Sequence, residues 1–260
     1  MKYRRIIIII LIIYFLYRII YNINYKFKKY KSHDKIKKRY YSNYWNRPIV
    51  LINLIRKNDI DLLLKLLKQG YNVNYKDEKG RTAIFYCRDV KTFNMLITFG
   101  ASINIKDDAG TSLLQNYTDK YNSVGFNDFK SDYKTGLKDI IEVLLSYGID
   151  INISDDNDEN ALTSIIRSPY CDYSYEIFNL LLLYGADCTV KNINNMTTIM
   201  IAAQNKNCNT IDFIKKLINC GADLFAKDNK GNNALFYAAE TEDIELIKFL
   251  LSKGLDPNLI

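Results

Sequence analysis

The stretch LLLLYGAD at residues 180–187 joins a Leu-rich run to Gly-Ala-Asp, and KKLINCGAD (215–223) and IKFLLSKGLD (247–256) repeat the pattern. Looser copies lie upstream, and the six glycines that end these stretches are Gly70, Gly100, Gly148, Gly185, Gly221 and Gly254. Their spacings are 30, 48, 37, 36 and 33 residues. A unit that recurs about every 33 residues is typical of a repeat array in which each unit contacts its neighbours.

The sixth of these units shows the pattern most clearly. It opens with the polar turn Asp228-Asn-Lys-Gly231, continues into a short apolar segment that ends at Ala239, and finishes with an amphipathic segment from Ile244 to Gly254. A polar turn, a short helix, a break and a longer helix follow one another in most of the units. Each unit has one apolar stripe, which is too small to form a core alone and which stacking would bury. In the sixth unit the stripe comprises Leu246, Ile247, Leu250 and Leu251.

This order of residues resembles the ankyrin repeat. The consensus of that family runs D-x-x-G-x-T-P-L-H-x-A-A, then a break, then L-x-I-V-x-x-L-L-x-x-G-A-D. Asp228 and Gly231 match its opening turn. Ala238-Ala239 match its alanine pair, and Leu250-Leu251 match its leucine pair.

The resemblance implies an all-α solenoid of about six ankyrin repeats over residues 47–258. The predicted repeats span residues 47–75, 76–105, 106–153, 154–190, 191–226 and 227–258. Asp158 and Asn195 stand where the family has glycine in the turn. Because Asp and Asn tolerate the left-handed conformation, we expect these turns to survive. The resemblance also implies recognition of a protein, but it names no partner.

The charge is distributed unevenly along the chain. Residues 1–39 hold 12 Lys and Arg and one acidic residue, a net charge of +11, whereas residues 40–260 hold 24 Lys and Arg and 28 Asp and Glu, a net charge of −4. The mildly acidic body argues against nucleic-acid binding. The abundance of Ile, Asn, Lys and Tyr is typical of an AT-rich genome, and with the repeats it resembles ankyrin repeat proteins of large DNA viruses or intracellular bacteria.

An unbroken apolar run, IIIIILIIYFLY, fills residues 6–17 and continues past Arg18. About a dozen Ile and Leu residues favour membrane insertion by about 5 kcal/mol, against a cost of about 3 kcal/mol for one central Arg. We therefore predict a transmembrane anchor at residues 6–23, a short basic N-terminus at 1–5 and a polybasic, aromatic linker at 24–46. A cleaved signal peptide and a merely sticky tail are the alternatives, although no small-x-small cleavage site follows the run.

The linker contains KFKKYKSHDKIKKRYY at residues 26–41. By the positive-inside rule this segment places the repeat body in the cytosol, which predicts a single-pass membrane protein. It is either a topology signal and solvated spacer or, in addition, a strip that binds anionic lipid headgroups. The only histidine, His33, lies in it and is expected to be solvated. The aromatic residues expected to cover the first repeat are Tyr40, Tyr41, Tyr44 and Trp45.

The five cysteines are Cys87, Cys171, Cys188, Cys208 and Cys220. Their number is odd and none forms a C-x-x-C pair. This pattern favours reduced thiols in a cytosol-like compartment over a disulfide framework.

The sequence contains no motif for catalysis or cofactor binding, because G-x-x-x-x-G-K, G-x-S-x-G and H-E-x-x-H are all missing. The acidic run at residues 155–159 faintly resembles a calcium-binding loop. A loop that starts at Asp156 would need Gly and Glu where the chain has Ala161 and Arg167, so a repeat turn explains the run better. We predict a non-catalytic protein without cofactor or metal.

Repeat solenoids bind partners through an extended concave face. In ankyrin repeats the turn tips and the first helices form that face. The resemblance therefore gives as candidate partner-binding residues Glu78, Lys79, Arg81, Asp108, Asp156, Asn157, Glu159, Asn194, Asn229 and Lys230. Their charge is acidic in the middle and mixed to basic at both ends, which favours a partner with the complementary pattern. For any single one, a solvated loop tip is the simpler interpretation.

The third unit is longer than the others by about 15 residues, which fall within residues 117–136 between its two helices. Long insertions are either functional or disordered. The aromatic residues in this one predict an exposed loop that anchors a partner, with Tyr121, Phe126 and Phe129 as candidates. The alternative is a tolerated insertion whose aromatic side chains pack on the solenoid.

Together these features predict a membrane-anchored module that binds a protein partner and is not an enzyme. By analogy with viral and bacterial ankyrin repeat proteins, the partner would be a host factor. The alternative is a tether that uses the polybasic segment on anionic lipid. The sequence sets neither the partner nor the oligomeric state.

Overall fold

The computed structural model describes residues 48–123, 131–168, 171–205 and 210–257. The predicted anchor, the linker and the aromatic cover lie outside these residues. The described helices are α3 (Pro48–Lys57), α4 (Ile60–Lys68), the 3-10 helix η1 (Ala83–Tyr86), α5 (Val90–Thr98), α6 (Leu113–Ser123), α7 (Ser131–Ser146), α8 (Ala161–Ile166), α9 (Cys171–Leu183), α10 (Thr198–Gln204), α11 (Thr210–Asn219), α12 (Ala234–Glu240) and α13 (Ile244–Ser252). In this part of the chain there is no β-strand, which agrees with the predicted all-α class.

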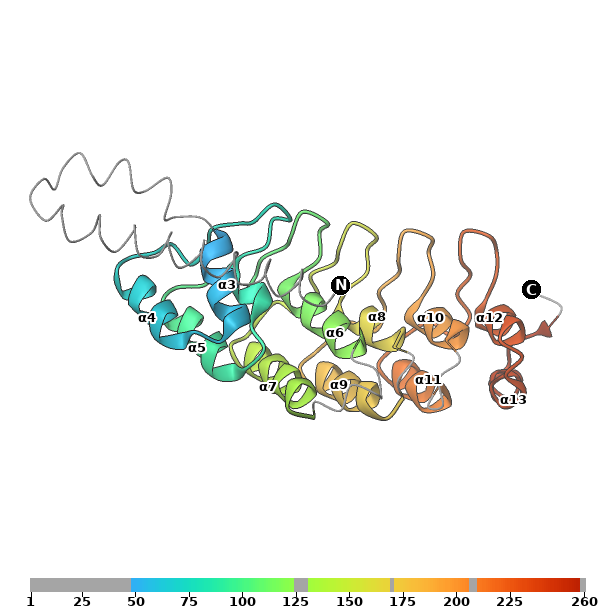
Figure 1. Cartoon of the computed structure of the whole chain (residues 1–260). Coiled ribbons are helices and arrows are strands. Elements are labelled where there is room, and N and C mark those ends of the chain that lie inside the picture. The colour runs from blue at the N-terminus through green and yellow to red at the C-terminus, as the bar shows by residue number, and fades with distance from the viewer. Residues whose placement is uncertain (1–47, 124–130, 169–170, 206–209, 258–260) are drawn as a thin grey trace, which may run out of the picture. The chain divides into compact units, whose positions relative to one another are not determined.

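The helices alternate between a first and a second helix of each pair. Figure 1 shows the first helices α6, α8, α10 and α12 in one row and the second helices α7, α9, α11 and α13 in another. Long loops project beyond the row of first helices and return to it. The arrangement therefore puts all the predicted turn tips on one edge of the repeat domain.

Side chains of Asp and Asn fix where many helices begin. Asp59, Asp89 and Asp243 precede α4, α5 and α13, and each accepts a hydrogen bond from the backbone nitrogen three residues later, at 3.2, 2.8 and 3.0 Å. Asn160 and Asn233 do the same for the first helices α8 and α12. Such caps contribute about 1 kcal/mol each, because they satisfy donors that the helix cannot.

The core fills the space between the two helices of each pair and between successive helices of each row. Phe178 on α9 and Phe213 on α11 are fully buried, and their ring centroids are 4.5 Å apart. In the last pair, Leu246 and Leu250 are fully buried, but Leu251 is 40% exposed. The predicted apolar stripe of α13 is thus buried along its inner half only.

The second unit is the shortest, with 30 residues between its glycines. Its first helix is reduced to the single 3-10 turn η1, and Asp89 starts α5 three residues later. A short Gly-to-Gly spacing is therefore accommodated by loss of the first helix, while the second helix keeps its nine residues.

The predicted loop in the third unit is largely helical. α6 continues to Ser123, and α7 begins at Ser131. Tyr121 lies on α6 and is only 2% exposed, so the prediction that it is an exposed anchor is wrong. Its ring packs inward because α6 continues through this position as far as Ser123. Phe126 and Phe129 lie outside the described residues.

The prediction of reduced thiols is wrong for one pair of cysteines. Cys188 and Cys220 form a disulfide with a Cα–Cα distance of 6.0 Å. They are 32 residues apart, about one repeat period, so the stacking of successive units brings them together. Cys87 is buried and carries a free thiol.

Within the described residues, no helix is both long and apolar enough to cross a membrane. The predicted anchor at residues 6–23 was not among the residues that this finding covers.

Candidate functional site: an edge of linked turns

Asp107 shows how each turn on this edge is built. Its Oδ1 accepts hydrogen bonds from the backbone nitrogens of Ala109 and Thr111, both at 3.0 Å. Its own N–H donates to the carbonyl of Thr111 at 3.0 Å, and Gly110 has a φ of +75°. An acidic or amide side chain at the first position and a residue that tolerates a positive φ at the fourth therefore define the turn.

The same bonds recur at Asp77, Asp155, Asn192 and Asp228, with side-chain oxygen to nitrogen distances of 2.8–3.1 Å. At the fourth position, Asp158 and Asn195 replace glycine and have φ values of 58° and 63°. The prediction that these two residues preserve the turn is confirmed.

Neighbouring turns are hydrogen-bonded to one another through their backbones. The N–H of Asp108 donates to the carbonyl of Lys79 at 3.0 Å. Equivalent bonds join Ile193 to Asn157 at 3.1 Å and Asn229 to Asn194 at 3.0 Å. These backbone bonds fix the spacing of the tips at three of the four junctions between the five described turns, as a binding surface requires.

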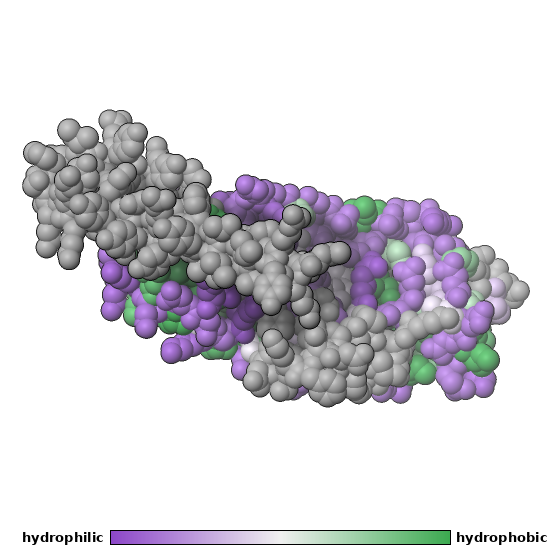
Figure 2. All heavy atoms as spheres, viewed as in Figure 1, coloured by the Kyte–Doolittle hydropathy of each residue, from purple (hydrophilic) through white to green (hydrophobic). Residues whose placement is uncertain are grey.

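Eight of the ten predicted partner-binding residues are exposed on this edge. They are Glu78, Lys79, Asp108, Asp156, Asn157, Asn194, Asn229 and Lys230. Figure 2 shows mainly hydrophilic side chains along the turns on the face that it presents. Two of the exposed tip residues are apolar, namely Ala109 and Ile193, and Ile193 is 54% exposed. The edge thus combines charged groups with one large apolar side chain.

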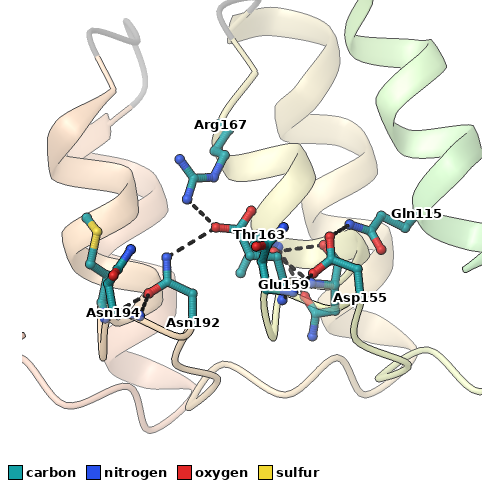
Figure 3. Close-up of polar contacts among 10 residues, drawn as sticks. Gln115, Asp155, Glu159, Thr163, Arg167, Asn192 and Asn194 are labelled. Carbon is teal, nitrogen blue, oxygen red and sulfur yellow. Dashed lines mark hydrogen bonds and ion pairs between the residues drawn. The ribbon is translucent and has the colours of Figure 1, made fainter. Parts of the chain in front are cut away.

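The other two candidates, Arg81 and Glu159, are half-buried and bind groups within the domain. The Arg81 guanidinium contacts Asp107 Oδ2 at 2.7 Å. Glu159 Oε1 accepts from Arg167 and, at 3.2 Å, from Asn192 of the next turn, as Figure 3 shows. These two residues therefore hold adjacent turns together, and we exclude them from the exposed tips.

Several polar residues below the tips were not singled out from the sequence. Gln115 on α6 donates to Asp155 Oδ2, in the turn of the next unit, at 2.8 Å (Figure 3). Tyr86 donates to Asp77 Oδ2 at 2.5 Å, and Tyr237 donates to Asp228 Oδ2. The signal that could have found the tyrosines is their common position, nine residues after the turn aspartate.

These bonds shift the pKa values of their partners. Burial acts to raise the pKa of Asp77, but hydrogen bonds from Tyr86, Lys79 and Arg81 outweigh it, so the pKa lies below its usual value. Burial and the hydrogen bond to Asp77 raise the pKa of Tyr86 to about 12. The pair therefore stays as carboxylate and neutral phenol over a wide pH range.

Asp119 and Lys120 near the end of α6 have shifted pKa values as well. Burial raises the pKa of Asp119, the hydrogen bond from Ser164 opposes this, and the charges of Asp155 and Glu159 add to the increase. Burial lowers the pKa of Lys120 to about 8. Its ammonium group contacts the carbonyl oxygen of Phe85. Asp119 is thus bonded to the next unit through Ser164, and Lys120 to the preceding unit through Phe85.

In the residues that the structure describes, no group of three or more His, Cys, Asp or Glu side chains is placed to hold a metal ion. The acidic side chains of residues 155 and 159 instead make hydrogen bonds that stabilise the turn and its contact with the next unit. Asp155 accepts from the backbone, and Glu159 accepts from Arg167 and Asn192.

Comparison with known families agrees with this geometry. The family described as "Ankyrin repeats (3 copies)" matches residues 165–260. Over these residues the chain consists of ankyrin repeats. Ankyrin repeats form protein–protein interaction modules, and the turn geometry of residues 77–81 and 107–111 continues the repeat geometry N-terminal to the matched segment.

Among curated relatives, the similar proteins include viral ones named "Putative ankyrin repeat protein". One from Acanthamoeba polyphaga mimivirus is 28% identical over 225 residues, which cover 81% of this chain and 26% of that protein. A second mimivirus protein is 26% identical over 68% of this chain and 32% of its own length. One from Fowlpox virus is 26% identical over 49% of this chain and 17% of its own length. The aligned regions thus span about a third or less of these relatives.

Proposed function

We propose that this ankyrin repeat protein binds a protein partner through the edge of linked turns and the first helices behind it, and that it is not an enzyme. The observation that carries this proposal is the repeated turn. Five turns have the same hydrogen bonds, and their side chains at the second and third positions are exposed. A rigid row of varied exposed side chains suits recognition, because its ordering costs little entropy on binding.

The partner that fits this edge has a charge pattern opposite to it. The middle of the edge carries Asp108 and Asp156, whereas Lys79 and Lys230 lie on the turns to either side of it. A partner with basic groups at its centre would be favoured by electrostatic complementarity, mainly through its rate of association. The relatives from viruses make a host protein a natural candidate.

Affinity capture with matched variants would test the edge. The tip variant changes Glu78, Asp156 and Lys230 to Ala, and the control variant changes Asp61, Glu245 and Lys248 to Ala on the second helices, where all three are exposed. Both variants remove two acidic groups and one basic group. We expect a partner that full-length wild type and control retain and the tip variant loses. Retention by all three would contradict binding through the tips.

We further propose that residues 47–258 form six repeats within the bounds predicted above. The support is the set of turns at Asp77, Asp107, Asp155, Asn192 and Asp228 and the helix pair α3–α4 that precedes them. Amide hydrogen exchange should give six protected segments that are separated at these turns. Uninterrupted protection across one of the turns would contradict the assigned bounds.

We also propose that residues 6–23 anchor the chain in a membrane, on the basis of the sequence alone. The full chain should sediment with membranes and resist extraction by alkaline carbonate, and a chain lacking residues 6–23 should not. Neutralising Lys35, Lys37, Lys38 and Arg39 distinguishes this anchored binding module from the alternative, a tether that uses the polybasic segment on anionic lipid. Loss of localisation in that variant, with residues 6–23 intact, would favour tethering through lipid headgroups.

A further inference from the structure

Asparagine side chains join neighbouring units on the loops that follow the second helices. Four residues after its glycine, each of the first three such loops carries Asn74, Asn104 or Asn152. The Oδ1 atom of each accepts, at 2.9 Å, the backbone N–H two residues after the next glycine, from Ser102, Asp150 and Asp187 respectively. Each asparagine thus ties one unit to the next.

The fourth loop lacks this bridge. Thr189 takes the place of asparagine, and its hydroxyl and N–H both bond to Asp187 of its own loop, at 2.7 and 2.8 Å. The disulfide between Cys188 and Cys220 joins the two units at this junction instead. The asparagine is also replaced in the fifth loop, by Phe225, so the disulfide joins the first of the two junctions without it.

We propose that the Cys188–Cys220 disulfide is a redox-sensitive link that holds the turns of residues 192–196 and 228–232 in register with those before them. When the disulfide is reduced, the fourth loop is joined to the fifth neither by a covalent bond nor by an asparagine side chain. In a repeat array each interface contributes separately to stability, so loss of one link loosens the stacking at that interface. The proposal does not depend on the partner.

Reduction of the link does not require the whole domain to unfold. Phe178 and Phe213 still pack across the same interface, with centroids 4.5 Å apart. The amide of Asn205 also donates to the carbonyls of Ile166 and Ser168, at 2.7 and 2.9 Å. The expected change is thus a local opening on the side of the loops.

The exchange would start at Cys220, because Cys220 is exposed and Cys188 is 1% exposed. A thiolate of a dithiol attacks Cys220 Sγ, the disulfide breaks, and Cys188 leaves as a thiolate that takes up a proton. The second thiol of the reagent then closes on the first sulfur and releases Cys220 as a thiol. Two electrons pass from the dithiol, which becomes a cyclic disulfide, to the two cysteines.

Thermal unfolding and amide exchange of the full chain, with and without dithiothreitol, test the proposal. With the reductant, we expect the wild-type Tm to fall by about 5–10 °C. Amide exchange should accelerate at Ile193, whose N–H donates to the carbonyl of Asn157 across this junction. The double variant C188S/C220S should show the reduced behaviour under both conditions. If the double variant responds to the reductant as strongly as wild type does, or if wild type does not respond, the proposal is overturned.

A rescue variant tests whether the double variant is destabilised by loss of the disulfide or by the serine side chains themselves. T189N in the C188S/C220S background supplies the asparagine that the first three loops have at this position. Its side chain should accept the N–H of Asp223 and slow exchange there, with at least part of the lost Tm restored. The matched control T189S keeps a hydroxyl and should restore nothing. Equal effects of T189N and T189S would contradict the role assigned to the bridge.

Discussion

Tyr86 donates a hydrogen bond of 2.5 Å to Oδ2 of Asp77, nine residues before it in the chain. Tyr237 is related to Asp228 in the same way, four units later. In both aspartates Oδ1 accepts two backbone N–H groups of the turn. Each carboxylate therefore shapes its turn with one oxygen and fastens that turn to the first helix with the other.

Replacing Tyr237 with Phe should destabilise the domain by about 1–2 kcal/mol at pH 7, since a hydrogen bond to a charged group is lost. The ring remains to fill its buried site, so the change reports the phenol alone. Urea unfolding would measure the loss. Tyr184→Phe is the control, because that side chain is 46% exposed and should change little.

The difference between wild type and Tyr237→Phe should also depend on pH. Hydrogen bonds lower the pKa of Asp228 against the opposing effect of burial, so the stabilisation is present above the ordinary value of 3.8 and is lost as the pH falls through the lowered value. Burial and Asp228 raise the pKa of Tyr237 to about 12, so the stabilisation is complete below pH 10 and is lost toward pH 12. A constant difference from pH 3 to pH 12 would contradict this account.

Gly80→Ala should destabilise more than Gly231→Ala, although both glycines hold the fourth position of a turn with positive φ. A Cβ at Gly80 would lie 2.1 Å from Asp108 Oδ1 and 2.7 Å from Asp108 N, whereas a Cβ at Gly231 meets no atom within 4 Å. Backbone strain alone costs about 1–2 kcal/mol. We expect Gly231→Ala to show only that cost in urea unfolding and Gly80→Ala a larger one. Equal losses of unfolding free energy in the two variants would mean that the turn of Asp108 moves away from a Cβ at position 80 at no energetic cost, which would contradict the prediction.

The sequence was sufficient to predict the turns, because their determinants are local. Asp or Asn at the first position and Gly, Asp or Asn at the fourth act within five residues, and Asp158 and Asn195 adopt the conformation expected of them. Once the first and fourth positions of a turn are known, the second and third positions are the exposed tip. The start of α3 at Pro48 follows from an equally local rule, since proline suits the first turn of a helix.

Contacts between units were not predictable in this way. Tyr121 is buried because α6 continues beyond its usual length, and Arg81 is paired because Asp107 of the next turn lies beside it. The partner of Cys188 lies 32 residues away. Each of these depends on the stacking of one unit on another, which single-sequence patterns do not specify.

Lys120→Met should change how stability depends on pH. Burial lowers the pKa of Lys120 from 10.5 to about 8, so between these values the unfolded chain binds more protons than the folded chain, and wild-type stability rises with pH. The variant lacks this rise. Relative to wild type it should therefore lose about 3 kcal/mol at most between pH 8 and pH 10.5. Urea unfolding at several pH values would show it, and a difference that does not vary with pH would contradict the burial of the charge.

Tyr121→Ala tests whether the insertion in the third unit is part of the packed domain. Tyr121 is 2% exposed, and truncation of a buried aromatic side chain costs about 3–5 kcal/mol. Tyr147→Ala is the control, since Tyr147 is 50% exposed after the end of α7, and its loss should cost less than about 1 kcal/mol. Urea unfolding of both variants measures the difference. If the two lose the same small amount, the inserted residues do not pack as a continuation of α6, and Tyr121 would again be available as an anchor for a partner.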